Sequence, residues 1–169
     1  MEDFLRSGPW DGLNVTIPYK RQVLPYCAQL TPAAQRCGSV NLLVKGPDGT
    51  LTGDNTDLAG LTFLLRQNGR SLVGETVVIL GSGGTGHTAK AAAEELGAAE
   101  IAVVSRTGEL NYENLAERYG GRAFYLINTT PVGMAPESGV SPLELRAFPH
   151  CKGVADVIYN PLRTRLCQQ

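Results

Sequence analysis

The sequence has few of the residues that build metal sites or disulfide frameworks. Of its 169 residues, only two are histidine and four are cysteine. No two cysteines form a C-x-x-C pair, and neither histidine completes a ligand-type spacing with a cysteine. We therefore expect no metal site. The cysteines are expected to be reduced thiols, as is usual for a cytoplasmic protein.

Long apolar runs and an excess of charge of one sign are also absent. The formal net charge is −1, and 43% of the residues are hydrophobic. No apolar run approaches the roughly 20 residues that a membrane-spanning helix needs. The opening residues MEDFLRSGPW lack the basic start and apolar centre of a signal peptide. The composition favours a globular protein, and nothing in its charge points to nucleic acid or a membrane surface as partner.

Strands alternate with helices in the second part of the chain. Short apolar runs predict strands over residues 75–80, 100–105, 123–128 and 152–159. Helix-like stretches cover residues 87–97 and 111–120, the second with Asn111 as a cap. This alternation is typical of βαβ units, so we predict an α/β fold with a Rossmann-type parallel sheet.

The first part of the chain is more mixed. We predict strands over residues 12–17 and 39–45, a hairpin return over 50–57, and helices over 18–30 and 58–69. Gly69 is expected to end the last helix. We therefore divide the chain into two parts, residues 1–70 and residues 71–169.

Residues 81–86, GSGGTG, match the pattern G-x-G-x-x-G between a predicted strand and a predicted helix. Gly81 permits a tight turn, Gly83 lets the backbone approach a pyrophosphate, and Gly86 lets the helix pack against the strand. The free N–H groups at the helix start would face the anion. The alternative is a glycine-rich turn that binds no ligand.

The residues after the next strand discriminate between the two nicotinamide cofactors. NAD sites usually have an acid there for the ribose 2′-hydroxyl, but this chain has Ser105, Arg106 and Thr107. A guanidinium fork suits a 2′-phosphate, and the two hydroxyls can add donors. We therefore expect NADP(H), the alternative being an ordinary surface arginine.

Three polar residues of the first part stand in or beside apolar segments. Lys20 follows a predicted strand, Asn41 interrupts one, and Asp57 precedes a predicted helix. Taken singly they are an exposed lysine, a network or turn residue and a helix cap. Taken together they could hold a hydroxylated, anionic small molecule.

The order of motifs along the chain resembles that of shikimate dehydrogenases. The stretches that carry the resemblance are GLNVTIPYK, SVN, GDNTDLAG, GSGGTG, SRT, INTTPVGM and VIYNP. The resemblance implies NADPH-dependent, reversible reduction of 3-dehydroshikimate to shikimate in the biosynthesis of chorismate and the aromatic amino acids. Another Rossmann reductase, such as a folate dehydrogenase, would not combine GDNTD with NVTIPYK.

The resemblance also implies individual roles. Lys20 and Asp57 match the catalytic pair that moves the proton. The implied substrate ligands are Asn14, Thr16, Lys20, Asn41, Asp57 and Tyr159. The implied cofactor ligands are Gly81, Ser82, Gly83, Gly84, Thr85, Ser105, Arg106, Thr107, Asn128, Thr129, Thr130 and Val157.

Some parts of the family pattern do not occur in this sequence. The family has an earlier Ser-x-Ser-Pro segment that holds the substrate carboxylate, and further helices after the YNP motif. The sequence thus resembles an internal piece of such an enzyme. The resemblance implies a partial substrate-binding domain over residues 1–70 and an NADP-binding Rossmann domain over residues 71–169. Alternatives are an NADP-binding module with impaired catalysis and a quinate/shikimate dehydrogenase. The resemblance allows a homodimer.

Overall fold

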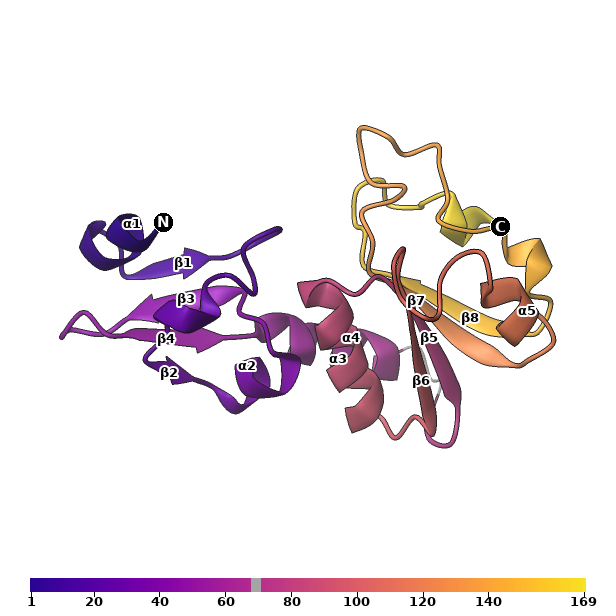
Figure 1. Ribbon diagram of the computed structural model, residues 1–169, viewed down its shortest axis with the longest axis horizontal. Coiled ribbons are helices and arrows are strands. Elements are labelled where there is room, and N and C mark those ends of the chain that lie inside the picture. Colours follow the sequence, from indigo (N-terminus) through magenta and orange to yellow (C-terminus); the bar gives the residue numbers. More distant parts are fainter. Residues whose placement is uncertain (68–70) are drawn as a thin grey trace.

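The computed structural model describes residues 1–67 and 71–169, and its strands form two four-stranded sheets. The two sheets lie at opposite ends of an elongated molecule, with helices α3 (Thr56–Gln67) and α4 (Gly84–Glu95) between them (Figure 1). The first sheet contains the N-terminal part of the chain and the second sheet contains the C-terminal part.

The first sheet has the strand order β1-β3-β4-β2. β3 and β4 form the predicted hairpin, β1 pairs antiparallel with β3, and β2 pairs parallel with β4. The apolar side chains of this part, such as Leu43 and Val40, form a core of their own. The elements are α1 (Glu2–Ser7), β1 (Gly12–Asn14), η1 (Leu24–Tyr26), β2 (Gln29–Leu30), α2 (Pro32–Cys37), β3 (Leu42–Lys45) and β4 (Leu51–Asp54).

The second sheet is fully parallel and has the order β6-β5-β7-β8. This confirms the predicted α/β class with a Rossmann-type sheet. The chain leaves β5 toward β6 on one side and returns to β7 on the other, which creates a topological switch point at the strand ends. The elements are β5 (Thr76–Leu80), β6 (Glu100–Val104), α5 (Leu115–Tyr119), β7 (Phe124–Asn128), η2 (Leu145–Ala147), β8 (Cys151–Asp156) and η3 (Leu166–Gln168).

Both faces of the parallel sheet are covered, which explains the almost continuous apolar runs of its strands. On one face Val77 and Ile79 pack with alanines of α4 and with Leu58 and Leu61 of α3. On the other face Leu80 and Phe124 pack with α5 and the C-terminal segment. Small alanine side chains let α4 lie close to the sheet, so its first turn is held next to the end of β5.

The predicted helix over residues 18–30 is wrong. Residues 18–23 form turns, and only η1 is helical. Two prolines interrupt the segment, and its backbone is engaged elsewhere because the carbonyl of Lys20 accepts a hydrogen bond from the Val40 N–H at 2.7 Å. The structure adds β2 and α2, which the sequence reading missed. α2 has the N-cap Thr31, which accepts from the Ala34 N–H at 3.2 Å, and ends at Gly38 with φ +55°.

Other boundaries shift by a few residues. The strand predicted over 12–17 ends at Asn14, and α4 begins inside the glycine motif at Gly84. The helix predicted over 111–120 is shorter, because Asn111 accepts hydrogen bonds from two following N–H groups in a turn before α5. The expected helix stop at Gly69 and the domain boundary at residue 70 lie outside the described residues. Within the described ranges, no helix has both the length and the apolar character needed to cross a bilayer.

Candidate active site

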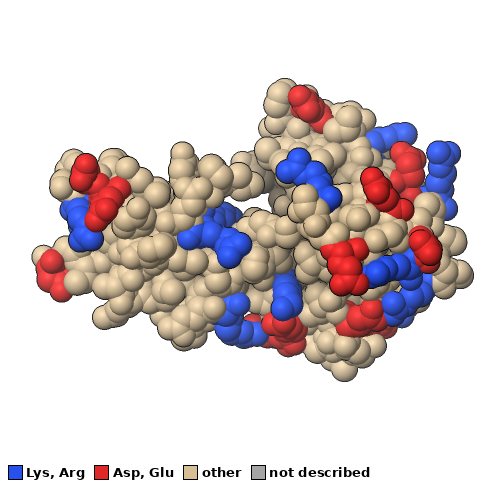
Figure 2. Space-filling model, viewed as in Figure 1, with Lys and Arg blue, Asp and Glu red and all other residues tan. Residues whose placement is uncertain are grey.

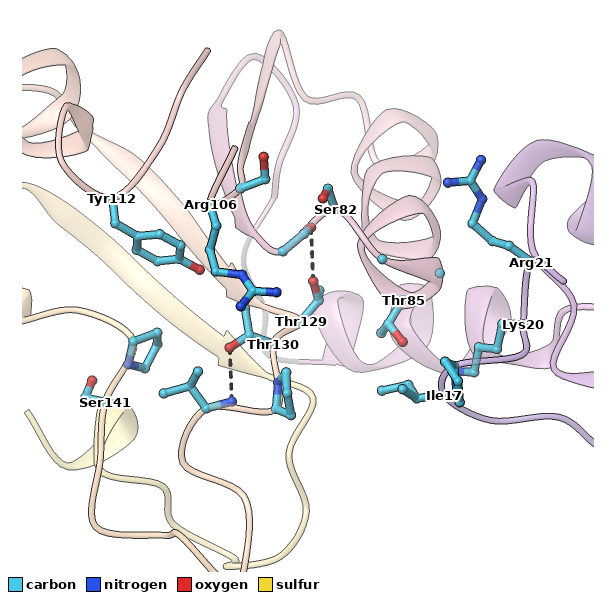
Figure 3. A pocket seen from close by; sticks show the side chains of 18 residues that line it. Ile17, Lys20, Arg21, Ser82, Thr85, Arg106, Tyr112, Thr129, Thr130 and Ser141 are labelled. Atoms are coloured by element: carbon cyan, nitrogen blue, oxygen red, sulfur yellow. Dashed lines mark hydrogen bonds between the residues drawn. The ribbon is translucent and has the colours of Figure 1, made fainter. Parts of the chain in front are cut away.

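Two adjoining cavities open between the two halves of the molecule, at the carboxyl ends of β5 and β7. The first, here called the loop cavity, has a volume of about 710 Å³ and is lined by the glycine motif (Figure 3). The second, here called the Lys–Asp cavity, has a volume of about 900 Å³. Figure 2 shows the surface hollowed between the two halves. The cavities share Ile17, Lys20, Thr85, Thr129, Thr130 and Pro131.

An ion pair between Lys20 and Asp57 lies at the junction of the cavities. Lys20 Nζ donates to Asp57 Oδ2 at 2.6 Å, and the two side chains are 13% and 38% exposed. Lys20 comes from the turn after β1, while Asp57 comes from the first turn of α3. Such a pair can hold an ammonium group in a fixed direction and move a proton to or from a substrate oxygen.

Asp57 is free to pair with Lys20 because other residues cap α3. Asn55 Oδ1 accepts from the Leu58 N–H at 3.2 Å, and Asn41 Oδ1 accepts from the Thr56 N–H at 2.9 Å. The reading of Asp57 as a helix cap is therefore wrong, and Asn41 is a network residue that organises the start of α3.

The other expected substrate ligands are only partly brought together. Thr16 and Tyr159 line the Lys–Asp cavity, and Tyr159 is 87% exposed at its rim. Asn14 and Asn41 line neither cavity. Asn41 reaches the Lys–Asp cavity indirectly, because its Nδ2 donates to the Oγ1 of Thr56, a lining residue, at 2.9 Å.

The glycine motif has the geometry of a phosphate-binding turn. Gly81 has φ +103°, a conformation that favours glycine. A Cβ on Gly86 would lie 2.2 Å from the carbonyl oxygen of Gly81, so no side chain fits there. A Cβ on Gly83 would meet no atom within 4 Å. The first turn of α4 thus starts directly beside the strand end, and its residues Gly84 and Thr85 line the loop cavity. The free N–H groups of a helix start favour an anion.

One side of the loop cavity is formed by Ser105 and Arg106, which follow β6. Thr107 does not line it, and no aspartate or glutamate does among the described residues. A cavity with this volume, a glycine turn and arginines but no acid fits a phosphorylated dinucleotide.

The residues after β7 and β8 shape the site mainly through hydrogen bonds to each other. Asn128 is fully buried; its Nδ2 donates to Asp156 Oδ1 at 3.0 Å and its Oδ1 accepts from the Thr130 hydroxyl at 2.7 Å. The Thr129 hydroxyl donates to the Leu80 carbonyl at 2.6 Å. Thr129 and Thr130 line both cavities and Val157 lines the Lys–Asp cavity, whereas Asn128 lines neither.

Sequence reasoning missed several residues of the site. Arg21 and Tyr112 line the loop cavity, and burial raises the pKa of the Tyr112 hydroxyl. His87, in the first turn of α4, lines neither cavity; its pKa is lowered by burial and by the nearby charges of Arg21 and Lys90. The charge of Arg21, adjacent to Lys20, was the available signal. Within the described residues, no cluster of His, Cys, Asp or Glu could hold a metal ion.

Comparisons with known proteins agree with this geometry. Residues 1–43 match the family described as "Shikimate dehydrogenase substrate binding domain". The chain is 37% identical to the shikimate dehydrogenase (NADP(+)) of Methanothermobacter thermautotrophicus, over 98% of this chain and 64% of the relative. It is 38% identical to the enzyme of the same name from Oleidesulfovibrio alaskensis, over 94% of this chain and 61% of the relative.

The chain is also similar to solved structures of shikimate dehydrogenases. The shikimate 5-dehydrogenase of Thermus thermophilus, in complex with NADP(H) and shikimate, has a TM-score of 0.78 and 34% identity, over 99% of this chain and 67% of that one. Shikimate dehydrogenase 1 from Peptoclostridium difficile has a TM-score of 0.87 and 30% identity, over 99% and 64%. The chain spans 61–64% of the length of the two curated relatives. The sequence and structure together show that the chain belongs to the shikimate dehydrogenase family.

Proposed function

We propose that this protein catalyses the NADPH-dependent, reversible reduction of 3-dehydroshikimate to shikimate, a step toward chorismate and the aromatic amino acids. The observation that carries the proposal is the Lys20–Asp57 ion pair, which stands in a cavity adjoining the glycine turn. The shikimate dehydrogenases that are similar to nearly the whole chain support the same reaction.

NADP(H), when bound, would supply or accept the hydride at its nicotinamide ring. The glycine turn would hold its diphosphate, through Gly81, Ser82, Gly83, Gly84 and Thr85. Ser105 and Arg106 would hold the 2′-phosphate, with Thr107 beside them. The nicotinamide side would be lined by Thr129, Thr130 and Val157. Asn128 would hold the segment after β7 in place, because its Oδ1 accepts a hydrogen bond from the Thr130 hydroxyl.

Lys20 would donate a proton to the ketone oxygen during reduction and accept one from the hydroxyl in the reverse direction. Asp57 would orient the Lys20 ammonium group through their 2.6 Å contact. We propose that Thr16 and Tyr159 contact the substrate from the cavity wall, and that Asn14 and Asn41 belong to the same site.

We extend the proposal to the partners, the location and the oligomeric state of the protein. A small-molecule substrate needs neither nucleic acid nor a membrane as partner, and we propose a cytoplasmic location, in keeping with four free cysteines. We also propose a homodimer, which sedimentation equilibrium would check by the mass of the particle.

The test measures NADP+ reduction with shikimate, in parallel with NADPH binding by fluorescence titration. Turnover that needs both shikimate and NADP+ would support the proposal. Binding of NADPH without turnover would instead indicate a cofactor-binding module. Quinate in place of shikimate would reveal whether the enzyme is a quinate/shikimate dehydrogenase.

A further inference from the structure

The loop cavity carries an excess of positive charge. Its lining contains three cationic side chains, Lys20, Arg21 and Arg106, and no acid among the described residues. Lys20 is neutralised by Asp57. Across residues 1–67 and 71–169, neither Arg21 nor Arg106 forms an ion pair. Two arginines are thus available to an anionic ligand.

The two arginines stand on different sides of the glycine turn. Arg106 extends from the end of β6 next to Tyr112, whereas Arg21 extends from the turn after β1 toward α4 (Figure 3). The two sides are close, because a Cβ on Gly84 would lie 3.1 Å from the Cβ of Lys20, the neighbour of Arg21. The pKa of His87, in the first turn of α4, is lowered by burial and also by the positive charge of Arg21.

This first turn is where a dinucleotide would present its pyrophosphate. α4 is 12 residues long and its N-cap is Gly83, so its free N–H groups and its positive dipole end favour an anion. Arg106 follows β6, the position that reads the ribose 2′ substituent. Arg21 lines the loop cavity but not the Lys–Asp cavity, so it faces the cofactor rather than the substrate.

We propose that Arg21 binds the pyrophosphate of the bound dinucleotide from the opposite half of the molecule, an inference that rests on the proposed function. The ligand would then be held by the glycine turn on one side and by the first half of the chain on the other. This contact would couple cofactor binding to the position of the adjacent Lys20.

The test exploits the fact that NADPH and NADH share the pyrophosphate but differ at the 2′ position. Dissociation constants of both are measured for the wild type, Arg21→Ala and Arg106→Ala. Loss of one charge-assisted contact at an exposed site should raise Kd by about tenfold. We expect Arg21→Ala to weaken both dinucleotides by the same factor, and Arg106→Ala to weaken NADPH far more than NADH.

Two further variants complete the experiment. Arg21→Lys keeps the charge and should restore most of the affinity, while Arg163→Ala removes an exposed arginine outside both cavities and should change nothing. The inference is overturned if Arg21→Ala binds both dinucleotides as the wild type does, or if it only raises KM for shikimate. A wild-type protein that binds neither dinucleotide would overturn the proposed function as well.

Discussion

Lys20 and Asp57 are separated by 37 residues in the sequence, yet Lys20 Nζ lies 2.6 Å from Asp57 Oδ2. The first sheet brings them together: β1 pairs with β3, β3 pairs with β4, and α3 starts where β4 ends. The Lys20 side chain is the more buried of the two, and it has its charged partner directly in contact. Each residue therefore depends on the other, which makes the pair testable as a unit.

Replacing either member of this pair should impair turnover more than binding. We expect Lys20→Ala to lower kcat by about 10²- to 10⁴-fold, the usual contribution of a positioned proton donor. KM for NADP+ should change little, because the glycine turn is intact. Asp57→Asn should also lower kcat. The fold-decrease in kcat of the double variant should be smaller than the product of the two single fold-decreases. Steady-state kinetics with shikimate measures all three.

Lys45→Ala is the matched control for Lys20→Ala. Lys45 ends β3 of the first sheet, in the same half of the molecule as Lys20, but its Nζ lies 4.2 Å from the centre of the Trp10 ring and donates to the Gly8 carbonyl. Its removal should leave kcat unchanged. A Lys20→Ala enzyme with normal kcat and raised KM would show that Lys20 only binds the substrate.

The glycines of the turn should respond differently to alanine. Gly86→Ala places a Cβ 2.2 Å from the Gly81 carbonyl oxygen, so α4 must move away from the strand. We expect a lower Tm together with loss of NADPH binding. Gly83→Ala meets no protein atom within 4 Å, so Tm should stay unchanged while NADPH binding weakens. Thermal unfolding and fluorescence titration separate the two cases.

Gly121→Ala serves as the control, because a Cβ there also meets no atom within 4 Å and the residue is remote from the glycine turn in sequence. It should alter neither Tm nor binding. Normal Tm and normal NADPH binding in Gly86→Ala would contradict the close approach of helix and strand.

The parallel sheet could be predicted from the sequence, because its strands are short apolar runs separated by helical patterns. The segment after β1 could not be predicted in the same way. Its helical spacing around Val23 and Leu24 reflects burial against the first sheet, and its prolines and its tertiary hydrogen bonds favour turns. Propensity describes local preference, and here tertiary contacts override it.

The candidate site, like the fold, could be predicted from the sequence only in part. Lys20 and Asp57 could be proposed from motifs, and the polypeptide does bring them together. The sequence pattern could not tell whether Asn55 or Asp57, two positions apart, caps α3. The structure shows that Asn55 accepts the capping hydrogen bond from the Leu58 N–H. Arg21 could not be singled out from the sequence, because exposed arginines are common and only the fold places it in the lining of the loop cavity.

Protonation of Glu100 at acid pH should lower the stability of the fold. Hydrogen bonds from Arg122 and Tyr119 hold the pKa of its carboxyl below the ordinary value. A lowered carboxyl pKa stabilises the fold above the unfolded-state pKa, and this contribution is lost as pH falls through the folded-state value. We expect Tm of the wild type to fall between about pH 5 and pH 3 by more than that of Glu100→Gln.

The difference should be small because the Glu100 side chain is 40% exposed and solvent screens the ion pair. Glu113→Gln, an exposed acid that no described residue pairs with, is the control and should follow the wild-type curve. Identical acid profiles for the wild type and Glu100→Gln would show that this carboxylate does not stabilise the fold.

The last prediction concerns the buried amide that joins the two halves of the molecule. Asn55 is 1% exposed, and its Nδ2 donates to the Ser39 carbonyl at 3.0 Å and to the Thr88 hydroxyl of α4 at 3.2 Å. Asn55→Ala leaves these buried acceptors without the Asn55 donor and removes one of the two side chains that cap α3. The free energy of unfolding should fall by about 1–3 kcal/mol.

Denaturant unfolding measures this loss, and Asn14→Ala, at the exposed end of β1, should change it by less than about 0.5 kcal/mol. Because Ser39 and Thr88 also hydrogen-bond the Gly84 carbonyl, the network fixes the glycine turn relative to the first sheet. Asn55→Ala should therefore also weaken NADPH binding, even though Asn55 lines neither cavity. Unchanged stability with unchanged NADPH affinity would show that Asn55 does not hold the two halves of the molecule together.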